Sequence, residues 1–212
     1  MVKKTLQAIF FIAIFSASII TSGCSGPRIY IHPTPGFDRI KKIAVMPFNN
    51  LSTDDKAGEK VRNSFVVELL RTGSFGVLDI GETDKLLQSA GLSYSESQNP
   101  TPVVNAPNAP GAKPEEIPIS KKIGDLLHVE AVLVGSVEEY SIDRVGDQSI
   151  PEVSVSVRLL DAETGIIIWA STYTKRGSTG IPILGWGKVN SLSKLSHQLA
   201  QDMVASLATY TR

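Results

Sequence analysis

The chain has 212 residues with 21 basic and 21 acidic side chains, so it carries no formal net charge at neutral pH. This balance lacks the basic excess of proteins that bind phosphate backbones, and it excludes nucleic acid as an expected partner. The chain has one cysteine and therefore no internal disulfide, which means that a packed core has to stabilise it.

The first 23 residues have the pattern of a removable export signal. Lys3 and Lys4 precede an apolar run, 6–20, that is shorter than the roughly 20 residues that a membrane-spanning helix needs. Small residues then lead directly to Cys24, the only cysteine. Removal of residues 1–23 leaves 19 basic against 21 acidic side chains, a net charge near −2. A cysteine of the buried core would not normally follow an export signal so directly, so we expect another role for Cys24.

The residues T-S-G-C at 21–24 resemble a bacterial lipobox, with Thr21 at the position where leucine is usual. The resemblance implies that the Cys24 thiol is acylated and that Cys24 becomes the first residue of the mature protein. Ser25 follows in place of aspartate, which by resemblance to Gram-negative lipoproteins implies sorting to the outer membrane. This covalent lipid is the only cofactor that we expect.

Two segments lack the composition of a folded core. The stretch 24–37 follows the cysteine and is predicted to be a lipidated, flexible tether. The stretch 93–118 contains few large apolar residues and cannot bury enough surface to order itself. We predict a flexible insertion inside a single domain, 38–212, because neither of the segments that flank it is expected to fold on its own. Half of the 12 prolines lie in this insertion: Pro100, Pro102, Pro107, Pro110, Pro114 and Pro118.

The remaining sequence predicts alternating strands and helices. Val61, Phe65 and Leu69 recur at helical spacing before Gly73, with N-cap candidates at 52–55. The predicted elements are a strand at 39–48, a helix within 49–73, a strand at 74–80, helices at 81–91 and 119–128, a strand at 131–144, strands at 153–159 and 166–173, and a helix at 190–208. This order predicts an α/β (α+β) domain in which helices pack on a mixed β-sheet.

The strongest local pattern is a β-hairpin. Apolar residues alternate with polar residues from Val153 to Leu159, which is the period of a half-buried strand. The residues D-A-E-T-G at 161–165 then turn the chain, and Gly165 can adopt the positive φ that a tight hairpin requires. The return strand follows at 166–173.

Four blocks in this order resemble the core of the curli production assembly lipoprotein family, the CsgG family, over 39–174. The blocks are K-K-I-A-V-M-P-F-N-N, E-L-L-R-T-G-S-F-G-V-L-D, H-V-E-A-V-L-V-G-S-V-E-E-Y and V-R-L-L-D-A-E-T-G-I-I-I-W. The same core is similar to the N-terminal domain of the translocation protein TolB and to LpoB, the lipoprotein activator of a peptidoglycan synthase. The resemblance implies a periplasmic α/β domain, tethered by lipid to the outer membrane, that binds other proteins.

Catalytic and metal-binding chemistry is not predicted. The histidines, His32, His128 and His197, are far apart in the sequence and have no acidic or cysteine partner at ligand spacing. Three pairs of carboxylates occur, and each has a structural interpretation. The pair at 54–55 is typical of a helix start, the pair at 115–116 lies in the insertion, and the pair at 138–139 is predicted to end a strand. No nucleophile elbow, phosphate-binding loop or dinucleotide-binding glycine motif occurs. We therefore expect no catalytic residue, no metal, no small-molecule substrate and no enzymatic activity.

In the channel members of the curli family, the resemblance implies that each subunit supplies two long hairpins that cross the membrane. The corresponding stretches of this chain, 141–152 and 176–191, are too short for such a pair of crossings. A subunit of an oligomeric secretion channel is therefore the least favoured alternative, although a homo-oligomer without a pore stays open.

The second of these stretches contains an apolar cluster between glycines: Ile181, Ile183, Leu184 and Trp186. Two interpretations stay open. The cluster could fold back over one end of the sheet, or it could be an exposed contact for a protein partner or a membrane.

The sequence thus predicts a noncatalytic outer-membrane lipoprotein that faces the periplasm and binds envelope proteins in secretion or envelope assembly. An activator of a peptidoglycan synthase, in the manner of LpoB, is the alternative.

Overall fold

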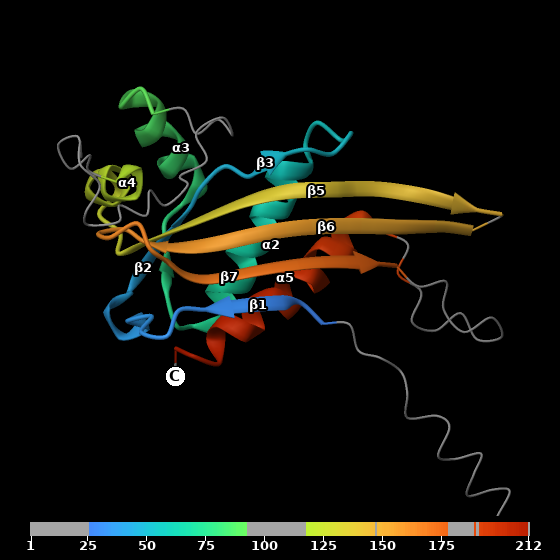
Figure 1. Ribbon diagram of the computed structural model, residues 1–212. Helices are drawn as coiled ribbons and strands as arrows, with labels where there is room; N and C mark the ends of the chain where they lie inside the picture. Colours follow the sequence, from blue (N-terminus) through green and yellow to red (C-terminus); the bar gives the residue numbers. More distant parts are fainter. Residues whose placement is uncertain (1–25, 93–117, 147, 178–188, 190, 212) are drawn as a thin grey trace, which may run out of the picture.

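The computed structural model describes residues 26–92, 118–146, 148–177, 189 and 191–211 (Figure 1). The predicted signal, Cys24, the insertion up to residue 117 and the apolar cluster at 181–186 lie outside the described residues. The elements are β1 (Arg28–Ile31), the 3-10 turn η1 (Phe37–Arg39), β2 (Lys42–Val45), β3 (Asn49–Asn50), α2 (Ala57–Thr72), β4 (Gly76–Val77), α3 (Ile80–Ser89), α4 (Ile119–Leu127), β5 (Ala131–Val145), β6 (Gln148–Asp161), β7 (Ile167–Arg176) and α5 (Leu192–Ala208).

All seven strands of the described chain form one mixed sheet, so the predicted α/β class is confirmed. The strand order is β1-β7-β6-β5-β2-β4, and β3 also pairs with β5. Strands β2 and β3 run parallel to β5, while β5, β6, β7 and β1 are antiparallel neighbours. Strands β5 and β6 are the longest, and they extend together beyond the rest of the sheet (Figure 1).

Helices cover the two faces of the sheet unequally (Figure 1). Helices α2 and α5 lie against one face, where Phe65 and Leu199 pack on the alternating core positions of β6. Helices α3 and α4 cover the other face at one end only, where Leu87 and Ile123 pack on the first half of β5. This arrangement explains why 131–134 is a continuous apolar run, since that part of β5 is buried on both faces.

Several sequence predictions are confirmed in detail. Val61, Phe65 and Leu69 are fully buried on α2, and Gly73 ends that helix with a positive φ. Gly165 also has a positive φ, as the predicted hairpin turn requires.

Other predictions are wrong at their boundaries. The predicted strand at 74–80 is reduced to Gly76–Val77, because Ile80 already begins α3 with Asp79 as its N-cap. Helix α2 starts after Lys56 and not after one of the predicted caps at 52–55. Asp54 instead accepts hydrogen bonds from Lys60 Nζ and the Lys56 backbone N–H. These two bonds, Lys60 first, hold the pKa of Asp54 below its usual value.

The stretch expected to be a tether contains a strand. Residues Arg28–Ile31 form β1, which pairs antiparallel with β7 at one edge of the sheet. Ile31 packs against the main core, which provides the apolar contact that holds this short strand. Only residues 25–27 therefore separate Cys24 from the folded domain. No helix in the described part of the chain is both long and apolar enough to cross a membrane.

Strand β1 leaves its outer edge open in the described structure. The His32 N–H donates to the Ile168 carbonyl, so the alternation of antiparallel pairing turns the backbone groups of Tyr30 toward β7 and those of Ile29 outward. We predict that Tyr30→Pro destabilises the fold by about 1–3 kcal/mol through loss of a ladder hydrogen bond. Ile29→Pro is the matched control, because edge strands tolerate proline where the N–H points outward. Urea denaturation of both variants measures the difference, and equal losses of stability would contradict this register.

Candidate functional site

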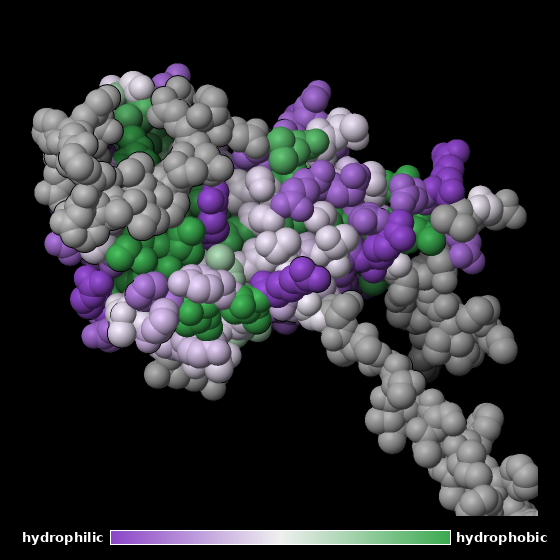
Figure 2. Space-filling model, viewed as in Figure 1, coloured by the Kyte–Doolittle hydropathy of each residue, from purple (hydrophilic) through white to green (hydrophobic). Residues whose placement is uncertain are grey.

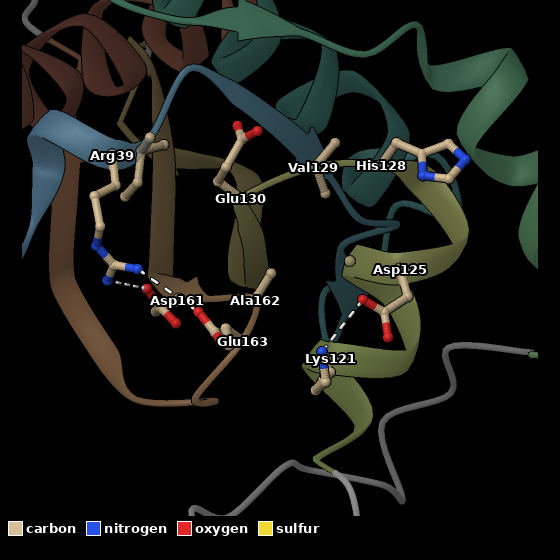
Figure 3. Close-up of a pocket in the computed structure, with 11 residues that line it drawn as sticks. Arg39, Lys121, Asp125, His128, Val129, Glu130, Asp161, Ala162 and Glu163 are labelled. Carbon is tan, nitrogen blue, oxygen red and sulfur yellow. Dashed lines mark hydrogen bonds and ion pairs between the residues drawn. The ribbon is translucent and has the colours of Figure 1, made fainter.

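The described structure contains a hollow of about 380 Å³ between η1, α4 and the β6–β7 turn (Figure 3). Charged side chains of both signs surround it. Helix α4 can approach the turn closely because residue 124 is glycine: a Cβ there would lie 2.6 Å from the Ala162 Cβ. His128, at the C-terminus of α4, closes the helix with a positive φ.

Asp161 is the central polar group of this hollow. Its side chain is only 5% exposed and accepts a hydrogen bond of 2.8 Å from Arg39 Nη2. The other carboxylate oxygen accepts hydrogen bonds from the backbone N–H and the hydroxyl of Thr164. Asp161 thus ties the β6–β7 turn to the segment before β2, which is a structural role.

The remaining carboxylates of the hollow also have partners within the chain (Figure 3). Glu130 accepts hydrogen bonds from the backbone N–H groups of Lys41 and Lys42. Asp125 pairs with Lys121 on the same helix, and Glu163 lies 3.8 Å from Arg39. Within the described ranges, no three His, Cys, Asp or Glu side chains are grouped so that they could hold a metal ion. The hollow is thus a place where polar contacts hold secondary-structure elements together, here called the joint at Asp161.

The three histidines lie on different elements. His32 follows β1, His128 caps α4, and His197 lies on α5 with its Nδ1 3.8 Å from a Glu68 carboxylate oxygen. The structure does not bring them together.

A second polar feature lies on the face of β5–β7 that α3 and α4 leave uncovered, shown in pale and purple in Figure 2. Glu138 accepts hydrogen bonds from the hydroxyls of Ser154 and Ser156. Those hydroxyls in turn bond to Thr174 and Thr172 on β7. The side chains form a row of hydroxyl groups across three strands.

The predicted strand end at Glu138–Glu139 is wrong. Strand β5 continues to Val145, and the register shifts between Val137 and Glu139. Glu138 lies on the same face as Val132 and Val134 by ordinary alternation. The β-bulge inserts one extra residue after Val137, so that Tyr140 and not Glu139 returns to the main core. Two consecutive glutamates do not indicate that a bulge interrupts the alternation of β5 at this point.

The apolar cluster predicted as a partner contact, Ile181, Ile183, Leu184 and Trp186, is outside the described residues, but the two ends of its loop are described. Gly177 donates its backbone N–H to the Pro151 carbonyl. A Cβ at 177 would overlap the Val189 carbonyl oxygen and would lie 2.6 Å from the Pro151 ring. The loop therefore leaves and returns at one point, at the outer end of β6 and β7, where only glycine allows the approach.

Comparisons with known proteins support the fold. No protein-family model matches the chain. The chain is similar to PelC of Paraburkholderia phytofirmans, solved as a dodecamer, with 18% identity and a TM-score of 0.55 over 86% of this chain and 96% of that one. It is also similar to the lipoprotein GNA1162 of Neisseria meningitidis, with 20% identity and a TM-score of 0.53 over 80% and 99% of the two chains.

The C-terminal domain of LpoB from Salmonella enterica is a more distant likeness, with 16% identity and a TM-score of 0.41 over 76% of this chain and 90% of that one. At these identities, the likenesses to PelC and GNA1162 establish a shared fold and nothing more. Membership of the curli assembly family stays a prediction.

The Asp161 contacts lead to a stability prediction. We expect Asp161→Ala to lower the free energy of unfolding by about 1–3 kcal/mol, because Arg39 and the Thr164 N–H lose their buried acceptor. Glu163→Ala removes the other, 73% exposed carboxylate beside Arg39 and is expected to stay within about 0.5 kcal/mol of the unaltered protein. Denaturant titration distinguishes the two, and a silent Asp161→Ala variant would show that the hollow does not join these elements.

Proposed function

We propose that this protein is a noncatalytic lipoprotein of the outer membrane whose periplasmic domain binds other proteins of the envelope, in secretion or envelope assembly. The observation that carries the proposal is the position of Cys24. It ends a lipobox-like T-S-G-C sequence after an export signal and precedes the first strand, β1, by four residues. A cysteine so placed is suited to hold a folded domain at a membrane surface.

Two further observations support this proposal. The fold is shared with a protein described as a lipoprotein, GNA1162, over nearly the whole length of that chain. The acidic groups around the hollow are bonded to donors of the same chain, so they are engaged in structure and not directed at a substrate. Binding of proteins by exposed surfaces is the activity that this arrangement favours.

The LpoB-like alternative, activation of a peptidoglycan synthase, differs in the partner and not in the anchor. The four steps along the chain from Cys24 to Arg28 span at most about 14 Å when fully extended. An enzyme activated by this domain would therefore have to come close to the outer membrane. A homo-oligomer is also compatible with the fold, since PelC was solved as a dodecamer.

The anchor is tested by processing and fractionation. Globomycin, which blocks the lipoprotein signal peptidase, is expected to cause accumulation of a larger precursor. Cys24→Ala is expected to shift the protein out of the membrane fraction, because the acyl chains have lost their attachment site. Cys24→Ser keeps a small polar side chain but lacks the thiol, so it is expected to leave the membrane fraction in the same way as Cys24→Ala. An unshifted precursor together with a membrane-bound Cys24→Ala protein would refute the lipid anchor.

The partner contact at Ile181, Ile183, Leu184 and Trp186 is tested through Trp186→Ala. If the cluster binds a partner, the variant keeps the melting temperature but loses crosslinked complexes in intact envelopes. Val67→Ala, which shortens an exposed apolar side chain on α2, is the control and is expected to keep both. A large drop in melting temperature for Trp186→Ala would instead mean that the cluster covers the sheet. Identification of the crosslinked proteins separates the secretion, assembly and peptidoglycan-synthase roles.

A further inference from the structure

We propose that the edge of the sheet formed by Arg28, Ile29 and Tyr30, here called the β1 edge, lies in the headgroup layer of the membrane and holds the domain edge-on. The inference rests on the proposed function, because it requires a lipid on Cys24. It adds an orientation and a second membrane contact, which the lipid alone does not provide.

The chain between Cys24 and β1 is short. Only residues 25–27 lie between Cys24 and Arg28, so the four steps from one to the other span at most about 14 Å when fully extended. Both headgroup layers together account for roughly 10–15 Å of a bilayer, so each is several ångströms thick. A lipid on Cys24 therefore places the start of β1 in this layer or directly beside it.

Two large side chains of this short strand are exposed. Ile29 is 46% exposed and Tyr30 is 49% exposed. Successive residues of a strand point to opposite faces of the sheet, so these side chains lie on the two sides of the same edge. A protein packed on one face of the sheet would cover only one of them. A fluid headgroup layer around the edge covers both.

The residue types of β1 also suit the membrane interface. Tyrosine is enriched at membrane interfaces, because its ring is apolar and its hydroxyl can remain in contact with water. Arginine at this level is attracted to phosphate groups of the lipids. Neither β1 nor the adjacent strand β7, Ile167–Arg176, contains an acidic residue, so no carboxylate of these strands opposes the approach.

Acidic groups from neighbouring elements also approach β7, and each is paired. Asp202 on α5 forms an ion pair with Lys175. Asp143 on β5 and Glu152 on β6 both pair with Arg176. These three carboxylates are thus paired with the basic side chains at the end of β7.

The orientation has a consequence for partner binding. Strand β4 lies at the opposite end of the strand order from β1, so it would be the edge farthest from the membrane. The hydroxyl row across β7, β6 and β5 would then run away from the membrane surface, and partners could reach it from the side.

The experiment uses the full chain, lipidated in cells and reconstituted into vesicles of phosphatidylethanolamine and phosphatidylglycerol. Because Cys24 is the only cysteine and its thiol carries the lipid, Ile29→Cys and Tyr30→Cys each introduce one free thiol for an environment-sensitive dye. Leu51→Cys is the control. Leu51 is 56% exposed and follows β3, which is separated from β1 by β5, β6 and β7, about 19 Å at the usual strand spacing.

Lipids with a spin label near the headgroup are expected to quench the dye at both 29 and 30 and to leave the dye at 51 unquenched. Two sites on opposite faces keep the test valid if one variant folds poorly. Dyes at 29 and 30 that stay unquenched on vesicle-bound protein would overturn the β1 edge contact and leave the lipid anchor intact. Reaction of the dye with the unaltered chain, together with loss of vesicle binding, would show a free Cys24 thiol and overturn both proposals.

Discussion

The fold depends on the antiparallel pairing of β5 with β6, which extends from Ala131 opposite Asp161 to Val145 opposite Gln148. One end of this ribbon is buried on both faces, between α2 and α5 on one side and α3 and α4 on the other. The other end is covered on one face only and presents hydroxyl groups on the second. The same two strands therefore provide the core, the joint at Asp161 and the exposed polar surface.

The parts of this fold that could be predicted are those whose signal is local. The alternation from Val153 to Leu159 and the glycine at 165 indicate the hairpin, and both are found as expected. Strand β1 could not be predicted, because four residues between prolines at 27 and 33 are too few to establish a period, and a partner 140 residues away holds them. The bulge at Glu138 also depends on the register with β6, which the sequence of β5 alone does not specify.

The hollow was beyond sequence reasoning for a similar reason. Arg39 and Asp161 are 122 residues apart, and neither belongs to a motif with a recognisable spacing. In contrast, the proposed lipid site consists of adjacent residues, so the sequence alone predicts it. The structure adds what the sequence did not indicate, which is that the folded domain begins only four residues after this site. A long tether would let the domain explore the periplasm, whereas a short one confines its binding surfaces to the neighbourhood of the membrane.

In the proposed function, a lipid on Cys24 holds the domain at the membrane. The most direct test is the intact mass of the protein purified from the membrane fraction of cells that carry lipoprotein-processing enzymes. We expect a chain that begins at Cys24 and is heavier than its amino-acid sequence by a diacylglyceryl group and an N-terminal acyl chain. A mass equal to an unmodified chain, with or without residues 1–23, would contradict it.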